Sequence, residues 1–285
     1  LFDIHNYYLN QDTEIIDYEQ LEDVARKVQP KIIICGYSAY SRTIDFQKFK
    51  QIAKETNALL MADIAHIAGM CATGHLQNPV PFSDVVTTTT HKTLRGPRGA
   101  MIMCKEEHAK AIDKAVFPGL QGGPHNHVNA AKAVAFKEAL TEDYKEYCGQ
   151  ILKNAKALAS ALMDNGIDLV TGGTDNHLMV IKLDTKGLTG KGKEVQNNLD
   201  AAEIFTNKNT IPYEPNSPFN PSGIRLGTPA VTTRGMKESE MQVIGMGIAK
   251  VINNHNDTST IEKVKNDILE LCKNFPLYPD MEILK

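Results

Sequence analysis

The chain has 285 residues, of which 42% are hydrophobic and 23% are charged, a composition typical of a globular protein with one large domain or two ordinary ones. Its net charge of −3 gives no electrostatic support for binding to nucleic acid or to an anionic membrane, and no apolar run approaches the roughly 20 residues that a membrane-spanning helix needs. The five cysteines form no C-x-x-C pair, which favours reduced thiols, as in a cytoplasmic protein, over a disulfide framework or a zinc site.

The first half of the chain alternates predicted helices and strands. Amphipathic spacing predicts the helices, and nearly continuous apolar runs predict the strands. In chain order we expect a helix at 19–28, a strand at 31–35, a helix at 46–56, and strands at 58–64, 84–89 and 99–104. This alternation predicts an α/β fold with a mostly parallel sheet and helices on both faces.

The second half is dominated by helical patterns. We expect a long helical stretch at 127–163, interrupted near Thr141 and Gly149, followed by a strand at 178–183, a helix at 193–203, a Pro/Asn-rich loop at 211–222 and helices at 239–254 and 261–274. The change in composition after Gly119–Pro124 predicts two domains. Residues 1–141 would form the larger domain, and residues 142–285 a smaller α+β domain.

Polar residues follow three predicted strands, at the strand ends where open α/β sheets bind ligands. The segment around Ser38 predicts only a turn when taken alone. We expect Asp63 to be a buried carboxylate that needs a partner, such as a protonated ring nitrogen, an arginine or a helix N-terminus, although a structural cap fits the same pattern. We expect partial desolvation of Lys92, which would favour a nucleophilic amine, although a solvated lysine in a turn has the same sequence.

An acid and a lysine at neighbouring strand ends suit pyridoxal phosphate (PLP). The lysine would hold the aldehyde as a Schiff base, and the acid would keep the pyridine nitrogen protonated. The glycine-rich loop at 119–124 could present backbone N–H groups to a phosphate, and it does not match a dinucleotide motif. Arg225 could clamp a carboxylate in bidentate fashion or form a structural ion pair. His125 and His127 have no further ligand at metal spacing, so no metal site is expected.

Five segments of the chain follow one another in a characteristic order: Asp63–Gly69, Val85–Gly99, Pro118–Pro124, Thr171–His177 and Ser222–Ala230. In this order they resemble the signature of the serine hydroxymethyltransferase family, and the similarity extends over essentially the whole chain. The resemblance implies a fold-type I PLP-transferase of one-carbon metabolism and amino-acid biosynthesis that acts in the cytoplasm as a homodimer with shared active sites. The implied reaction is reversible: serine and tetrahydrofolate give glycine and 5,10-methylenetetrahydrofolate.

The resemblance also implies roles for single residues. Lys92 would be the Schiff-base lysine and would act in exchange with the incoming amino acid instead of proton abstraction; Thr89 would assist that exchange, and His91 would influence reaction specificity. Asp63 would pair with the pyridine nitrogen, Ser38 and His66 would border the phenolic oxygen of the ring, and Gly122 and Gly123 would approach the phosphate of the partner subunit's cofactor. Arg225 would hold the substrate carboxylate, and the implied folate contacts are Asn209, Ser217, Pro218 and Phe219.

The chain departs from the family pattern at its start. It lacks an initial methionine, and the residues from Leu1 to His5 resemble the interior of an element, so we expect a preceding segment with further catalytic residues. A molecule that truly began at Leu1 is expected neither to bind PLP properly nor to turn over. Two alternatives stay open from the sequence: another fold-type I enzyme, such as a threonine aldolase or an aminotransferase, and a non-catalytic fragment or paralogue.

Overall fold

The computed structural model describes residues 2–278, and the chain divides into two compact units. The N-terminal unit contains most of the chain up to Cys148, and the C-terminal unit contains the chain from Gly149 onwards together with two short earlier segments, Gln11–Glu14 and Ala39–Arg42. The chain passes from one unit to the other within helix α6 (Glu142–Asp164). The predicted domain division between residues 141 and 142 stays a prediction.

The N-terminal unit is built on a four-stranded sheet with the order β1-β2-β3-β4. The pairs β1–β2 and β2–β3 are parallel, and β4 runs antiparallel to β3. All four strands were expected from the apolar runs, and the prediction of a mostly parallel sheet is confirmed. The strands are β1 (Ile32–Cys35), β2 (Leu59–Asp63), β3 (Val85–Thr89) and β4 (Ala100–Cys104).

Local signals in the sequence set the bounds of the first two helices. Asp17 caps α1 (Tyr18–Val28) by accepting the Gln20 N–H, and Asp45 caps α2 (Phe46–Glu55) by accepting the Lys48 N–H. Both helices agree with their predictions to within one residue. The sequence patterns did not predict three further elements of this unit: α3 (Ala68–Ala72), α4 (Glu106–Lys114) and the turn η1 (Ala115–Leu120), which precedes the expected helix α5 (Asn126–Glu138).

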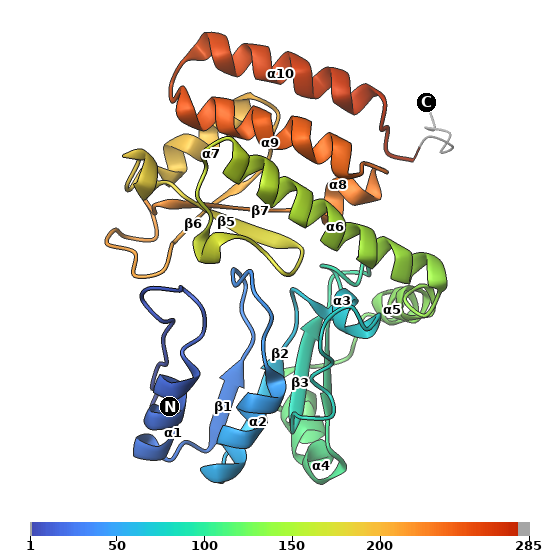
Figure 1. The fold of residues 1–285 in the computed structure, drawn as a ribbon. Helices are drawn as coiled ribbons and strands as arrows, with labels where there is room; N and C mark the ends of the chain where they lie inside the picture. The colour runs from blue at the N-terminus through green and yellow to red at the C-terminus, as the bar shows by residue number, and fades with distance from the viewer. Residues whose placement is uncertain (1, 279–285) are drawn as a thin grey trace. The chain divides into compact units, whose positions relative to one another are not determined.

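Helix α2 packs on one face of β1 and β2, as Figure 1 shows. Phe46, Phe49 and Ile52 are almost fully buried on the helix, and they meet the side chains of the strands that point to the same face. The strand residues alternate as the pleat requires, so Ile33 and Leu60 are buried whereas their neighbours Ile32, Ile34 and Leu59 are exposed.

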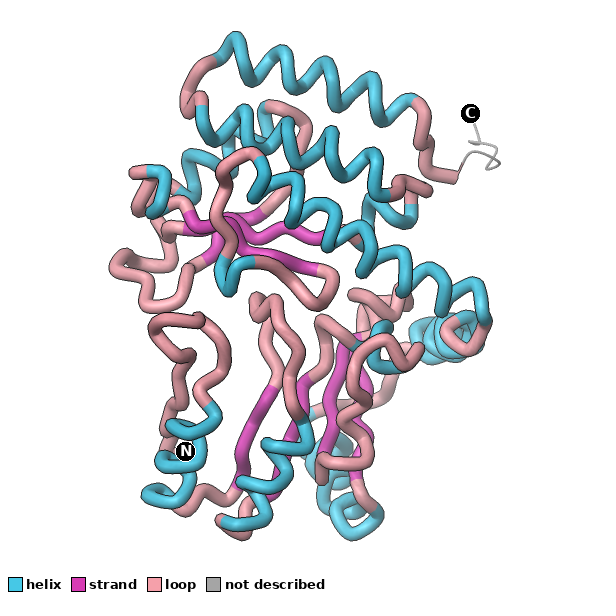
Figure 2. Tube along the Cα trace, viewed as in Figure 1, coloured by secondary structure: helices cyan, strands magenta, loops and turns pink. Residues whose placement is uncertain are grey.

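The C-terminal unit contains a second, antiparallel sheet with the order β5-β7-β6. Figure 2 shows the strands of this sheet in magenta. Helices α6, α9 and α10 lie over this sheet (Figure 1), and side chains such as Leu158, Leu162, Ile181 and Ile248 form the core between the layers. The elements are β5 (Leu178–Lys182), α7 (Gly192–Ala201), β6 (Asn207–Asn209), β7 (Gly223–Gly227), α8 (Pro229–Thr233), α9 (Glu238–Asn253), α10 (Thr258–Lys273) and the short turns η2 (Val170–Gly172) and η3 (Asp184–Lys186).

Most predictions for this half are confirmed, with three corrections. The expected break near Thr141 separates α5 from α6, but the break near Gly149 is wrong, because α6 runs through it with the neighbouring Cys148 and Ile151 fully buried. Packing of this kind outweighs the cost of about 1 kcal/mol that a glycine imposes on a helix interior. Helix α10 begins earlier than expected because Asp257 caps it, and β6 and β7 were not predicted as strands.

Among residues 2–278, no helix combines the length and the apolar character that crossing a membrane requires.

Candidate active site

Three polar segments follow β1, β2 and β3 at the same edge of the first sheet. The register pairs Cys35 with Ala62 and Asp63 with Thr87, so the chain segments that leave the three strands begin side by side. Gly36 makes the closest approach: its φ is +119°, and a Cβ atom placed on it would lie 1.9 Å from the carbonyl oxygen of Asp63. Only glycine fits there, and the turn that bears Ser38 is consequently held against the end of β2.

Asp63 is exposed, which corrects the expectation of a buried carboxylate. Its Oδ1 accepts the Ala65 N–H at 2.9 Å. Its Oδ2 accepts no hydrogen bond from the part of the chain that the structure describes. The carboxylate lies at the last position of its strand, where no further strand residue covers it, and one oxygen is available to a donor on a ligand.

Lys92 is exposed as well, so the expectation that this chain partly desolvates it is wrong. Strand β3 ends at Thr89, and the following turn is closed by a hydrogen bond from the Arg95 N–H to the Lys92 carbonyl. The side chain therefore extends from a turn and not from a strand covered on both sides. Its Nζ donates to Thr89 Oγ1 at 3.2 Å, which brings together two of the three predicted catalytic residues.

The residue after the lysine, Thr93, ties this turn to the segment that follows β2. Thr93 is buried, its Oγ1 donates to the carbonyl of His66 at 3.1 Å, and the same oxygen accepts the Gly69 N–H at 3.1 Å. The hydroxyl of Tyr144 donates to the Thr93 carbonyl at 2.7 Å. A Cβ on Gly69 would lie 2.6 Å from that hydroxyl, so the glycine leaves room for the bond. The predicted site residues Lys92 and His66 are thus connected through Thr93, which follows Lys92 in the chain and donates its hydroxyl to the His66 carbonyl.

His91 is oriented by two hydrogen-bond donors. The Gly99 N–H points to Nδ1 at 3.4 Å, and the Arg98 guanidinium lies 3.2 Å from Nε2. A neutral imidazole has a single acceptor nitrogen, so it accepts from one of these two donors at a time. The ring is held by the β3–β4 connection next to the lysine.

Gly122 and Gly123 lie in the exposed loop between η1 and α5. A Cβ on either glycine would meet nothing within 4 Å, and the N-cap residue of α5, His125, makes no side-chain hydrogen bond to the first turn. The loop leads directly into a helix of 13 residues. Its open backbone and the positive end of the helix dipole are compatible with an anion.

The predicted substrate residues belong to the C-terminal unit. Arg225 is in the central strand β7, paired with Val180 of β5 and Asn207 of β6, and its Nε donates to Asn207 Oδ1 at 3.1 Å. Partial burial lowers the pKa of Arg225 from its ordinary value. The guanidinium nevertheless stays charged, because the ordinary pKa of arginine lies far above neutral pH.

The four predicted folate residues lie on β6 and in the loop that follows it. Asn209 is half-buried in β6, whereas Ser217, Pro218 and Phe219 are exposed. The residue that shapes this loop, Glu214, was not predicted from the sequence. Burial alone would raise the pKa of Glu214, but hydrogen bonds from the Ser222 N–H and hydroxyl, both 2.7 Å long, lower it and keep the carboxylate charged.

A family model described as serine hydroxymethyltransferase matches residues 1–248. The serine hydroxymethyltransferase of Microcystis aeruginosa (strain NIES-843 / IAM M-2473) is 54% identical over 283 residues, which cover 99% of this chain and 66% of that relative. The chain belongs to the serine hydroxymethyltransferase family. The predicted fold class, a fold-type I PLP-transferase, is confirmed by this membership.

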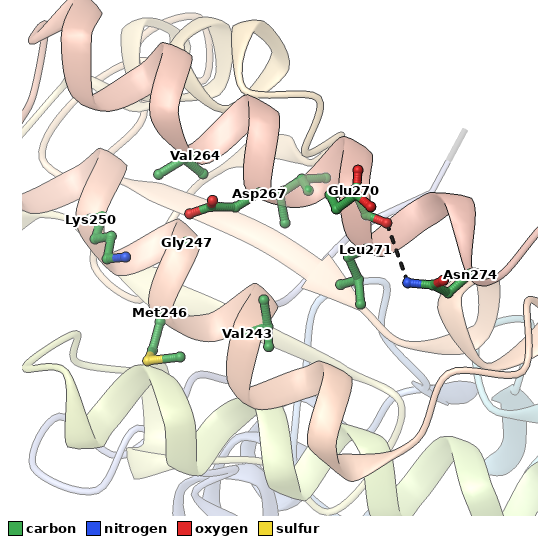
Figure 3. A pocket seen from close by; sticks show the side chains of 10 residues that line it. Val243, Met246, Gly247, Lys250, Val264, Asp267, Glu270, Leu271 and Asn274 are labelled. Atoms are coloured by element: carbon green, nitrogen blue, oxygen red, sulfur yellow. Dashed lines mark hydrogen bonds between the residues drawn. The ribbon is translucent and has the colours of Figure 1, made fainter.

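Two other features of the structure involve none of the predicted site residues. Figure 3 shows a groove between α9 and α10, lined by apolar side chains such as Val243 and Leu271, with Lys250, Asp267 and Glu270 beside them. None of the predicted site residues lines this groove.

The second feature is a cluster of ionisable side chains at the opposite end of β3, where the buried Asp84 lies near the exposed Glu107 and the half-buried His108. Lys50 and Lys105 both donate to the Asp84 carboxylate and so already neutralise it. Burial alone would raise the pKa of Asp84, but the Leu60 N–H and the two lysines lower it to about 2. The cluster therefore stabilises the strand and does not resemble a cation site.

The residues that hold the site in place were missed from the sequence. Tyr144 lies 51 residues from Thr93, and no local pattern connects them. Thr93 itself was within reach of sequence reasoning, because it is a polar residue directly after the lysine at the start of a buried turn.

Proposed function

We propose that the protein to which this chain belongs transfers the hydroxymethyl group of serine reversibly to tetrahydrofolate, giving glycine and 5,10-methylenetetrahydrofolate. The chain spans about two thirds of the length of the curated relative that it matches, and the activity is therefore proposed for the whole protein. The observation that supports it best is the set of groups at one sheet edge: the amine of Lys92, the hydroxyl of Thr89 and the open carboxylate oxygen of Asp63.

The donor set fits PLP. Lys92 offers an accessible primary amine for the aldehyde, and Asp63 Oδ2 is available to hold a proton shared with a ring nitrogen. Ser38 and His66 follow the adjacent strands and would border the phenolic oxygen, while Gly122 and Gly123 leave the backbone room that a phosphate needs. When bound, PLP supplies a conjugated ring that accepts the electron pair left on the substrate carbon.

The residues of this chain would then bind and orient the cofactor and the substrate. Thr89 Oγ1 holds the Lys92 amine by the hydrogen bond that exists already, and it would orient that amine as it gives way to the amine of the substrate. Asp63 would keep its proton partner fixed, and His91 would border the reacting groups. Arg225, positioned by Asn207, would bind the substrate carboxylate by two parallel N–H bonds.

The folate would contact Asn209, Ser217, Pro218 and Phe219. The Phe219 carbonyl accepts a hydrogen bond from Lys208 Nζ at 2.6 Å, and the same ammonium lies 5.9 Å from the Phe219 ring. This pair gives the exposed loop an aromatic face and a positive charge, which suit a flat ring system with carboxylates.

The partner would be a second copy of the protein, with shared active sites. Helix α5 buries only Ala135, and the apolar side chains of Phe117, Leu120, Val134 and Leu140 are exposed on η1, on α5 and just beyond it. Exposed apolar side chains that recur within one stretch of the chain support a contact surface there. Gly122 and Gly123 lie in the same stretch, where they would approach the phosphate held by the other subunit. A cytoplasmic location completes the proposal.

The experiment measures cofactor and folate dependence in the protein at its natural length. The purified protein should be yellow with PLP, and borohydride should attach the cofactor to Lys92; Lys92→Arg should lose both signals. Added tetrahydrofolate should sharply accelerate serine cleavage. A colourless protein with no modified lysine would refute the proposed PLP-dependent activity. Good cleavage of threonine or 3-phenylserine, with no effect of tetrahydrofolate on the rate of serine cleavage, would favour an aldolase.

A further inference from the structure

Two tyrosines hold the turn that carries Ser38. The hydroxyl of Tyr7 donates to the carbonyl of Ile34 at 2.8 Å, and the hydroxyls of Tyr7 and Tyr37 lie 2.5 Å apart. A tyrosine hydroxyl has one proton, and that of Tyr7 is used on Ile34. The proton between the two hydroxyls therefore belongs to Tyr37, which donates to Tyr7.

The position of Tyr7 is itself fixed by the helical layer. Its ring meets Phe49 of α2 edge to face, with centroids 5.9 Å apart, and Phe49 is fully buried. Tyr18 of α1 contacts the same ring in a similar way, at 5.5 Å. Burial is the main reason that the pKa values of Tyr7 and Tyr37 are raised, so both hydroxyls remain protonated and able to donate.

In the sequence, Tyr37 lies between two residues of the candidate site, Gly36 and Ser38. Gly36 before it is pressed against the Asp63 carbonyl, and Ser38 after it is the proposed neighbour of the cofactor ring. The turn is thus fixed on one side by the close approach of Gly36 to β2 and on the other by the hydrogen bond from Tyr37 to Tyr7.

We infer that Tyr7 and Tyr37 are positioning residues, which hold Ser38 in place beside Asp63 before any ligand binds. The inference rests on the proposed function for the use of Ser38, but the ordering of the turn is a property of the cofactor-free chain. A preordered turn does not have to be immobilised when a ligand binds, so that part of the ordering cost is absent from the binding free energy.

The test compares Tyr37→Phe with Tyr18→Phe by hydrogen exchange in the cofactor-free protein. Tyr18 is the matched control, because its ring contacts Phe49 as that of Tyr7 does, but its hydroxyl accepts the Asp45 N–H at the start of α2. Tyr37→Phe should speed amide exchange over residues 36–38 by about 3- to 10-fold, the range expected for the net value of one hydrogen bond. Tyr18→Phe should leave exchange there unchanged. Equal exchange in the wild type and in Tyr37→Phe would overturn the inference.

The loaded protein gives the second measurement. Tyr37→Phe should weaken PLP binding by about 3- to 10-fold and change the pH dependence of the visible absorbance, whereas Tyr18→Phe changes neither. In a Tyr7→Phe background, Tyr37→Phe should have no additional effect, because its acceptor is already gone. Additive effects of the two substitutions would refute the coupling. A wild-type protein that binds no PLP would refute the proposed function, and the exchange comparison would still decide whether the tyrosines order the turn.

Discussion

Replacing Gly36 by alanine should be among the most damaging single-methyl changes in the chain. The glycine has φ +119°, outside the left-handed region near +60° that other residues tolerate best, and the new methyl would lie 1.9 Å from the Asp63 carbonyl oxygen and 2.7 Å from its carbon. The methyl therefore meets backbone, which cannot rotate away as a side chain can. To make room, the turn after β1 must separate from the end of β2.

The magnitude follows from two contributions. The positive φ costs an alanine about 1–2 kcal/mol, and the enforced overpacking adds about 1–3 kcal/mol, so the free energy of unfolding should fall by about 2–5 kcal/mol. Gly74 provides the matched control. Its φ is +74°, and a Cβ there would meet nothing within 4 Å, so Gly74→Ala should cost only the conformational part, about 1–2 kcal/mol.

Urea denaturation followed by circular dichroism measures the difference. Gly36→Ala should have a lower transition midpoint than Gly74→Ala at an unchanged slope. Gly36→Ala should also lose PLP binding in the natural-length protein, because Ser38 and Asp63 no longer keep their spacing, whereas Gly74→Ala should retain it. Equal midpoints for the two variants would refute the close approach of Gly36 to Asp63, and with it the geometric basis of the site.

Three further substitutions test the supports around the site. The pKa of Asp84 is lowered to about 2 in the folded chain, so the contribution of this carboxylate to stability is present above about pH 4 and is lost as the pH falls toward 2. Asp84→Asn should therefore lower the free energy of unfolding by about 1–2 kcal/mol at pH 7, after allowance for solvent screening at the lysines. In urea titrations near pH 2 the same substitution should cost almost nothing. Tyr144→Phe removes the hydrogen bond to the Thr93 carbonyl and should lower the free energy of unfolding by about 1–2 kcal/mol, together with a weaker PLP affinity by absorbance titration; a change in stability without any change in affinity would show that the bond does not position Lys92. Glu214→Gln should loosen the loop at Ser222 and raise the KM for folate more than that for serine, and equal changes in the two KM values would contradict its assignment to the folate side.

The sequence predicted those features that depend on residues close to one another in the chain. The apolar runs predicted all four strands of the first sheet. The residues that follow β1, β2 and β3 were predicted to share one edge of the sheet because parallel strands end together, and the strand register places them there. Asp63 and Lys92 were placed correctly on this edge. Their environment was not, since burial depends on what covers a position, and both side chains are exposed.

The residues that escaped prediction act over long separations. Tyr144 reaches Thr93 from a different helix, and Tyr7 reaches Tyr37 across 30 residues. Each uses a single hydroxyl, which leaves no periodic pattern in the sequence. The strands β6 and β7 escaped for a related reason: one has three residues and the other begins and ends with glycine, so neither shows the alternation by which a strand is recognised.

Residues that would contact the ligand can be distinguished by experiment from residues that hold the surrounding backbone in place. Lys92 and the Asp63 carboxylate are exposed, and each makes a single hydrogen bond within its own segment of the chain, so replacing either should change ligand binding at little cost in folding. Thr93 and Gly36 are held against neighbouring backbone, so their replacement should lower stability and binding together. A plot of the change in PLP affinity against the change in unfolding free energy should therefore place the variants in two groups. Variants of Lys92 or Asp63 that fell with the second group would show that these side chains are structural, and the proposed chemistry at this sheet edge would then have to be abandoned.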